Sequence, residues 1–152
     1  MIREPLILLQ ADLDDDTPEN LSHATGLLLD AGALDCVRVP ILMKKGRSGI
    51  RFEVLTTKDR SDELGRLLLV HTRTIGYRVL PVNRVSLERQ EIAIVLSNHQ
   101  IHCKAVFLDG KLLRIKAEFD DCAIASHKTG RPIAQIREQA ERLAREELND
   151  SP

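Results

Sequence analysis

The hydrophobic positions in the first half of the chain follow two periods, that of a helix and that of a strand. After Thr17-Pro18-Glu19, apolar side chains recur every three or four residues as far as Gly32, which predicts an amphipathic helix. A second helix is predicted from Ser61, because Leu64, Leu67 and Leu68 share one helical face. Short apolar runs bounded by turn residues predict strands at residues 5–13, 36–44, 50–56 and 75–85.

Residues 5–80 therefore have the predicted order β-α-β-β-α-β. This order is typical of a ferredoxin-like sandwich, in which two helices cover one face of an antiparallel sheet.

The second half of the chain has a different pattern. Residues 92–96 and 101–108 alternate as strands, with residues 97–100 as the predicted connection. Asp109-Gly110 predicts a tight hairpin to a further strand. Helices are expected at residues 120–128, ending at Gly130, and at residues 132–148.

The predicted fold class is thus α+β, with a ferredoxin-like sandwich followed by a small β-rich subdomain that carries C-terminal helices. The expected boundaries are residues 1–82 for the sandwich and 83–152 for the second part. We expect the second part to pack on the first, so that the chain forms one compact unit.

Composition narrows the classes of function. A net charge of −1 and an aromatic content of 3% disfavour nucleic acid as a partner, because no basic surface or stacking platform is evident. No apolar stretch approaches a membrane span, so no membrane partner is expected. The three cysteines form no pattern of disulfide or zinc sites, which favours a cytoplasmic protein.

An acidic cluster, Asp12-Leu13-Asp14-Asp15-Asp16, separates the first strand from the first helix. Clustered carboxylates at such a junction can bind a hard divalent cation, directly or through water. Asp12 and Asp14 share one strand parity, so their side chains are expected to converge. The alternative is a solvated acidic turn that caps the helix.

A basic segment, Lys44-Lys45-Gly46-Arg47, lies between the second and third predicted strands. Glycine allows the backbone to approach a ligand closely, and lysine and arginine supply charge and donors, which suits a polyphosphate. The alternative is an ordinary hairpin loop.

A third segment, His71 to Arg78, follows the second helix and contains Thr72, Thr74, Gly76 and two arginines. Hydroxyl and guanidinium groups at such a turn can hold phosphate oxygens. The signal is weak on its own.

Five motifs follow one another along the chain: residues 11–19, residues 31–35, Pro40 to Arg47, Thr72 to Arg78 with Leu87-Glu88-Arg89, and Arg114 to Ala123. In this order they resemble the C-terminal domain of the LarC family of nickel insertion proteins, from about residue 7 to residue 146. The chain departs from the family pattern at Ser48, His71, Arg73, His99 and Ala117.

The resemblance implies a function in the maturation of the lactate racemase cofactor. The family is described as a cyclometallase, a lyase that inserts nickel, its substrate metal, into a pyridinium bis-thiocarboxylate mononucleotide. It cleaves CTP to CMP and diphosphate, and its C-terminal domain binds CTP with Mg²⁺ or Mn²⁺. Members form homo-oligomers, so a trimer or hexamer is expected here, together with a separate nickel-binding N-terminal partner chain.

The resemblance implies two sets of site residues, one for a divalent metal ion and one for the nucleotide phosphates. The metal would be held by Asp12, Asp14 and Asp15. No catalytic residue is assigned. The alternative function is a non-catalytic nucleotide-sensing or oligomerisation module of the same fold. The proposed ligands of the nucleotide phosphates are Lys44, Lys45, Arg47, Arg78, Thr72, Thr74, Arg89, Lys104 and Lys116.

Overall fold

The computed structural model describes residues 1–150, and the chain divides into two compact units. One unit is formed by residues 3–84, and the other by residues 1–2 together with the chain from residue 85 onward. The division falls within strand β4 (Arg78–Ser86). The packing of the second part on the first stays a prediction.

The unit of residues 3–84 holds a four-stranded sheet with the order β2-β3-β1-β4. Strand β3 pairs antiparallel with both β1 and β2, so it lies between two strands that a helix connects. This is the split arrangement expected from the order β-α-β-β-α-β, and the α+β class is confirmed. Its main elements are β1 (Ile2–Leu13), α1 (Pro18–Asp30), β2 (Asp35–Leu42), β3 (Ser48–Thr56), α2 (Ser61–His71) and β4.

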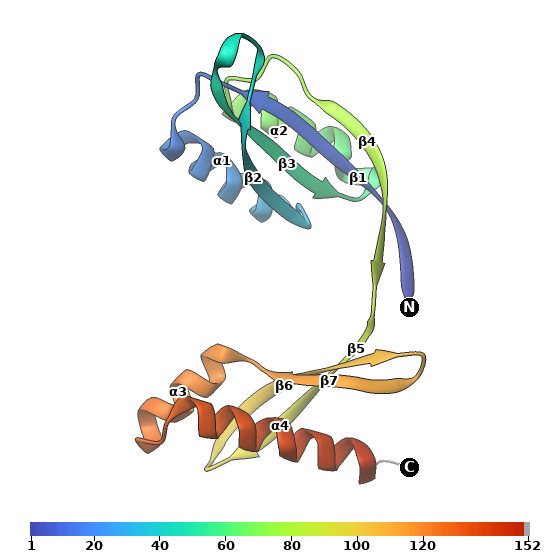
Figure 1. Cartoon of the computed structure of the whole chain (residues 1–152), viewed down its shortest axis with the longest axis vertical. Coiled ribbons are helices and arrows are strands. Elements are labelled where there is room, and N and C mark those ends of the chain that lie inside the picture. Colours follow the sequence, from blue (N-terminus) through green and yellow to red (C-terminus); the bar gives the residue numbers. More distant parts are fainter. Residues whose placement is uncertain (151–152) are drawn as a thin grey trace. The chain divides into compact units, whose positions relative to one another are not determined.

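Helices α1 and α2 cover one face of this sheet (Figure 1). The core between them contains Leu9 and Phe52 from the sheet, Leu28 from α1 and Leu68 from α2, all almost fully buried. Helix α1 begins where the sequence predicts, because the Thr17 hydroxyl accepts a hydrogen bond from the Asn20 backbone N–H at 3.2 Å.

The second unit is a three-stranded antiparallel sheet, β5-β6-β7, covered by two helices. The Asp109-Gly110 hairpin is confirmed, since both residues have positive φ, at 50° and 74°. The predicted connection at 97–100 is wrong in length: Ser97 and Asn98 alone form a tight turn with positive φ, and residues 99–100 pair with β5. The elements are β5 (Glu88–Leu96), β6 (His99–Leu108), β7 (Lys111–Ala117), α3 (Phe119–Thr129) and α4 (Ile133–Asp150).

Helix α4 contributes Ile136, Ala140 and Ala144 to the core of the second unit, where they meet Ile101 and Cys103 of the central strand. Their spacing of four residues puts them on one helical face. Within residues 1–150, no helix is long and apolar enough to cross a membrane.

Candidate functional site

A surface cleft of about 530 Å³ lies between two turns of the first unit that are some sixty residues apart in the sequence. One wall is the end of β1 and the acidic turn, and the other is the segment from Arg73 to Arg78 between α2 and β4. The two walls meet because β1 and β4 are neighbours in the sheet, and β1 ends near the point where β4 begins. The acidic and third segments of the sequence analysis therefore belong to one site.

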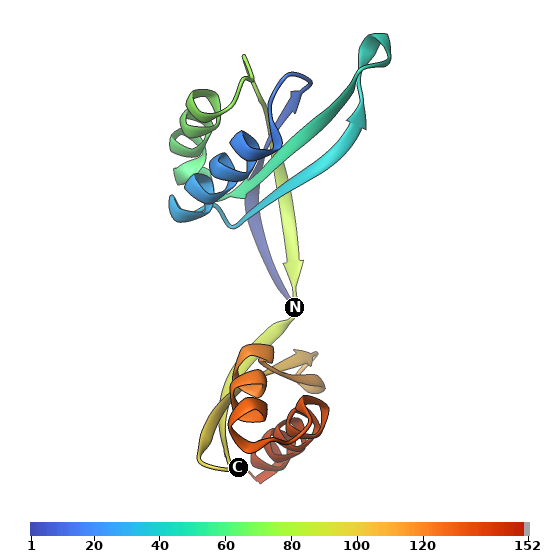
Figure 2. The same ribbon diagram turned by 90° about the vertical axis from the view of Figure 1, so that its left-hand side faces the viewer.

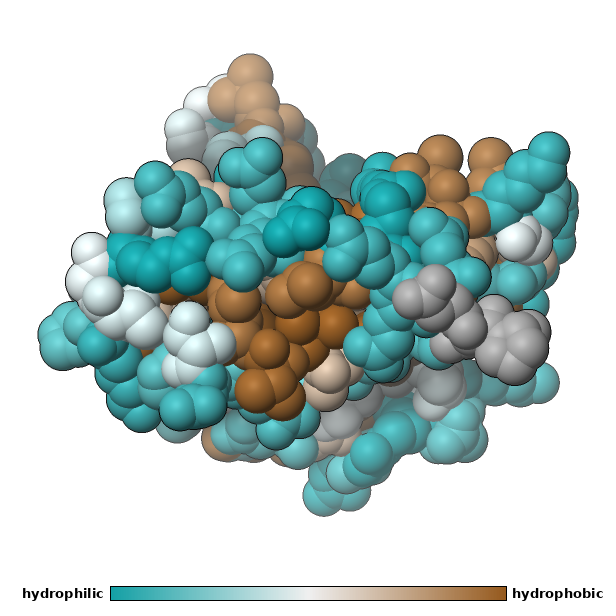
Figure 3. Space-filling model, turned by 90° about the horizontal axis from the view of Figure 1, so that it is seen from below, coloured by the Kyte–Doolittle hydropathy of each residue, from teal (hydrophilic) through white to brown (hydrophobic). Residues whose placement is uncertain are grey.

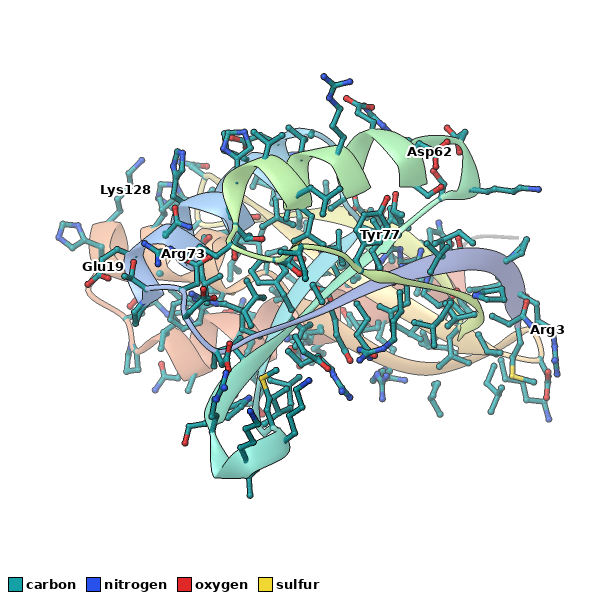
Figure 4. The ribbon with its side chains drawn as sticks, turned by 90° about the horizontal axis from the view of Figure 1, so that it is seen from above. Arg3, Glu19, Asp62, Arg73, Tyr77 and Lys128 are labelled. Carbon is teal, nitrogen blue, oxygen red and sulfur yellow. The ribbon has the colours of Figure 1, made fainter. Side chains whose placement is uncertain are left out.

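Asp16 joins the two walls of the cleft. One carboxylate oxygen, Oδ2, accepts a hydrogen bond from the backbone N–H of Arg73 at 2.9 Å. The other, Oδ1, accepts from the backbone N–H of Thr17 at 2.9 Å and from the side-chain amide of Asn20 at 2.8 Å. Asn20 also donates to the carbonyl of His71 at 3.1 Å. The start of α1 thus holds the turn after α2, and Figure 4 shows Arg73 close to this end of α1.

Replacing Asp16 with alanine is expected to lower the free energy of unfolding by about 2 kcal/mol, because three donors lose a shared acceptor. Asp15→Ala is the matched control, since Asp15 makes no side-chain hydrogen bond or ion pair within residues 1–150. Urea denaturation of both variants measures the difference. Equal losses of stability in the two variants would contradict the stabilising role of Asp16 between α1 and the turn after α2.

Tyr77 closes the cleft on the side of α2. Its ring packs against Gly65, where a methyl group would overlap the phenol oxygen and the ring carbon that carries it. Figure 4 shows Tyr77 beside α2. A glycine in the middle of a helix costs stability relative to alanine, and here the missing side chain makes room for the tyrosine.

Two arginines from neighbouring strands converge on Asp12. Arg51 on β3 donates from Nε to Oδ1 at 2.7 Å and from Nη2 to Oδ2 at 3.1 Å, a two-point contact. Arg78 at the start of β4 donates from Nη2 to Oδ2 at 3.0 Å and from Nη1 to Gln10 at 3.2 Å. The hydrogen bonds from Arg51, and then the one from Arg78, lower the pKa of Asp12 to about 2, although partial burial opposes them.

The basic segment forms a 3-10 turn, η1 (Lys44–Gly46), at the end of the hairpin of β2 and β3. Lys45 and Gly46 have positive φ, at 63° and 70°. Figure 2 shows this hairpin end projecting away from the helices, and Lys44 and Lys45 are exposed. Arg47 reaches back to the acidic turn, where its Nη1 donates to Asp14 at 2.7 Å.

The sequence profile of the family described as "Nickel insertion protein" matches residues 1–137. The chain belongs to this family. A protein of Akkermansia muciniphila named pyridinium-3,5-bisthiocarboxylic acid mononucleotide nickel insertion protein is 34% identical over 134 residues, 88% of this chain. A relative from Geotalea uraniireducens, also named for nickel insertion, is 33% identical over 93% of the chain. The chain spans about a third of the length of these curated relatives, 33% and 36%.

Two solved structures share the fold. The first is described as the apo C-terminal domain of a cyclometallase involved in the synthesis of the NPN cofactor of lactate racemase. It is 28% identical, with a TM-score of 0.81 over 95% of this chain and 99% of the other. The second, a protein of Methanopyrus kandleri, is 28% identical with a TM-score of 0.71, over 95% of this chain and 89% of its own. Because each comparison covers 95% of this chain, both of its units have counterparts in these solved structures.

The predicted phosphate ligands of the first unit occupy different places around the cleft. Arg78 and Thr74 line it, and Arg47 contacts Asp14, which also lines it. Thr72 is buried, and its hydroxyl donates to the Leu68 carbonyl at 2.7 Å, so it holds the end of α2. The remaining predicted ligands, Lys44 and Lys45, are not among the residues that line the cleft.

Three further predicted ligands belong to the second unit of this nickel insertion family member. Arg89 lies on β5, Lys104 on β6 and Lys116 on β7, where Lys104 and Lys116 are cross-strand partners. Lys104 also forms an ion pair with Glu118, at the N-terminus of α3. Their participation in the same site as Arg78 stays a prediction.

The predicted metal ligands do not form a ready cation site. Asp12 binds two arginines and Asp14 binds Arg47. In the part of the chain that the structure describes, no three His, Cys, Asp or Glu side chains are gathered to hold a metal ion. Asp15 lines the cleft and has no such partner among these residues. The donor set therefore fits one or two carboxylate contacts to a cation that arrives with other ligands, the usual mode of Mg²⁺ with phosphates.

Sequence reasoning missed the roles of four residues that shape the site, Asp16, Arg51, Gly65 and Tyr77. Tyr77 is the only tyrosine in the sequence and follows Gly76, a combination that marks it as unusual. Asp16 precedes the capping Thr17, which could have indicated a role at the helix start. No local signal identifies Arg51 or Gly65, because their partners are distant in the sequence.

Proposed function

We propose that the chain is the nucleotide-binding domain of a CTP-dependent nickel insertion enzyme. The enzyme would act on the pyridinium bis-thiocarboxylate mononucleotide in the maturation of the lactate racemase cofactor. The name of the Akkermansia relative supports nickel insertion into this mononucleotide. The description of the cyclometallase domain supports the link to the lactate racemase cofactor. The cleft supports nucleotide binding, because arginine side chains and acidic side chains line it together at one end of a sheet.

The cleft offers cations that can move to a polyphosphate. Arg73 and Arg78 line it with exposed side chains, and Arg47 is held next to it by the single exposed contact to Asp14. An exposed ion pair is worth little in water, so a phosphate oxygen can replace the carboxylate as the partner of Arg47. Lys44 and Lys45 on the projecting hairpin would add to the positive potential around the bound triphosphate.

A divalent cation would enter this site with the triphosphate. Asp14 and Asp15 are the carboxylates that would contact it, and Asp12, which also lines the cleft, is paired with two arginines. Such a cation would supply positive charge that offsets the charge developing on the phosphates during cleavage. The part of this chain would be to hold the cation through Asp14 and Asp15 and the phosphates through Arg47 and Arg78.

The proposal also covers the rest of the assembly. The curated relatives are about three times as long as the stretch that this chain matches, which supports a separate nickel-binding part. We propose a homo-oligomeric cytoplasmic protein that works with this part, and nickel as the inserted substrate metal. A non-catalytic nucleotide sensor of the same fold is the second candidate, because the exposed arginine cleft would bind a nucleotide in either case.

Isothermal titration calorimetry of the chain with CTP and Mn²⁺ tests the proposal, with UTP and ATP as competitors. Arg47→Ala is expected to weaken CTP binding about tenfold, because it removes a charge-assisted contact to phosphate. Lys45→Ala is expected to weaken CTP binding by a smaller factor, because it lowers the positive potential around the triphosphate. Their melting temperatures should stay close to the unchanged chain, since both side chains are exposed.

Lys58→Ala is the matched control, an exposed lysine beyond the opposite end of β3. Unchanged CTP affinity in Arg47→Ala with a lower melting temperature would make the segment structural. No binding of any nucleotide at millimolar concentration would overturn the proposed function. Binding of CTP without its cleavage in the presence of the nickel-binding part would favour the sensor.

A further inference from the structure

The second unit contains a separate cavity of about 330 Å³, where the end of β7 meets the first turns of α3 and α4. None of its lining residues belongs to the cleft of the first unit. Figure 3 shows hydrophobic side chains bordered by polar ones on the face seen from below. The cavity is lined by Lys116, Ala117, Phe119, Cys122, Ile133, Ala134 and Arg137.

The inner walls of this cavity are apolar. Ala117 and Cys122 are each 1% exposed, and burial raises the pKa of the Cys122 thiol, which keeps it neutral. Phe119 is 64% exposed and offers an aromatic side chain at the cavity. A cavity of about 150 Å³ with apolar walls is enough to hold benzene, so a space of this size admits one ring with a substituent.

Two cations, Lys116 and Arg137, border the apolar walls. Neither makes an ion pair or a side-chain hydrogen bond within residues 1–150. Nearby acids are engaged elsewhere: Glu118 pairs with Lys104, and Glu141 accepts from the Ala117 backbone N–H at 3.2 Å. The cavity thus combines an apolar interior with positive charges that have no partner in the described chain.

We propose that this cavity binds a small organic anion, one aromatic ring that carries a phosphate or carboxylate group. The ring occupies the space between Cys122, Ile133 and Phe119. The anionic group faces Lys116 and Arg137, whose donors have no other acceptor in residues 1–150. Apolar walls with a few charged groups that fix orientation are typical of small-molecule sites of this size.

Phenyl phosphate is the probe, titrated into the full chain and followed by the methyl NMR signals of Ala117, Ile133 and Ala134. These signals are expected to shift together with saturation. Inorganic phosphate should bind at least about tenfold more weakly, because it lacks the ring. Benzoate tests whether a carboxylate replaces the phosphate group.

Three variants sharpen the test. Lys116→Ala and Arg137→Ala are each expected to weaken phenyl phosphate binding about tenfold, whereas Arg145→Ala, two turns further along α4, should leave it unchanged. Ala134→Leu, at an exposed helix position, should fill the cavity and block binding without unfolding the chain. No methyl shifts at millimolar probe, or equal binding by all variants, would overturn the proposal. The linings of this cavity and of the cleft have no residue in common, and Arg137→Ala, at a position that is no predicted nucleotide ligand, separates loss of phenyl phosphate binding from loss of CTP binding.

Discussion

The Asp12→Ala variant is expected to lose about 3 kcal/mol of unfolding free energy. The carboxylate accepts three hydrogen bonds from Arg51 and Arg78, and it is only 15% exposed. Its removal leaves the guanidinium groups of Arg51, on the central strand β3, and Arg78, on the edge strand β4, without this counter-charge. Hydrogen bonds to charged groups contribute about 1.5–3 kcal/mol each, and the exposure of Arg78 reduces the total.

The effect of Asp12 depends on pH in a defined direction. Its pKa falls from 3.8 to about 2 in the folded chain, so the folded state favours the ionised form. The stabilisation is therefore fully present above about pH 4 and is lost as the pH falls from 3.8 toward 2. The difference in stability between the unchanged chain and Asp12→Ala should stay constant from pH 7 to pH 5 and shrink below pH 4.

Urea denaturation at several pH values measures this difference. Asp14→Ala is the matched control, because Asp14 has the single exposed partner Arg47 and should cost less than about 1 kcal/mol. Equal losses in the two variants, or a difference that grows as the pH falls, would show that the arginine pair does not stabilise the fold through Asp12.

Replacing Gly65 with alanine is expected to have opposite effects in two backgrounds. In the unchanged chain, the new methyl group overlaps Tyr77, and the three atoms nearest to it all belong to this side chain. Overpacking of this kind costs about 1–3 kcal/mol, which exceeds the gain of about 1 kcal/mol from alanine in a helix. The variant should therefore be less stable, and the displaced ring should also disturb the cleft.

In a Tyr77→Leu background the same substitution should become stabilising by about 1 kcal/mol, because the overlap is gone and the helix propensity remains. A thermodynamic cycle of the four proteins, measured by urea denaturation, gives the coupling between the two residues. A Gly65→Ala effect of the same sign and size in both backgrounds would show that Tyr77 does not occupy the space beside Gly65.

The local elements of the fold could be read from the sequence because each has a local cause. Thr17 and Pro18 start α1, Asp109-Gly110 makes a hairpin, and Gly130, with a φ of 69°, ends α3. The predicted length of the connection at 97–100 was wrong because its local signal is weaker. Ser97 and Asn98 form the tight turn at positive φ, where glycine is the more usual residue.

The candidate site could be predicted only in part. The acidic and third segments were identified by residue type, and their meeting in one cleft follows from the strand order. The predicted metal set, Asp12, Asp14 and Asp15, rested on their place in one acidic cluster, and strand parity brought together only Asp12 and Asp14. Sequence spacing carries no information on cross-strand partners, and these partners tie Asp12 and Asp14 to arginines.

By itself, the sequence determined the family, the α+β class and the order of the elements, because these depend on local periodicity and on motifs that are contiguous in the chain. The tertiary structure alone decided which charges meet. Asp16 holds Arg73 across 57 residues, and Asp12 holds Arg78 across 66. Such contacts arise only when β1 and β4 become neighbours in the sheet, so the geometry of the cleft is a property of the fold.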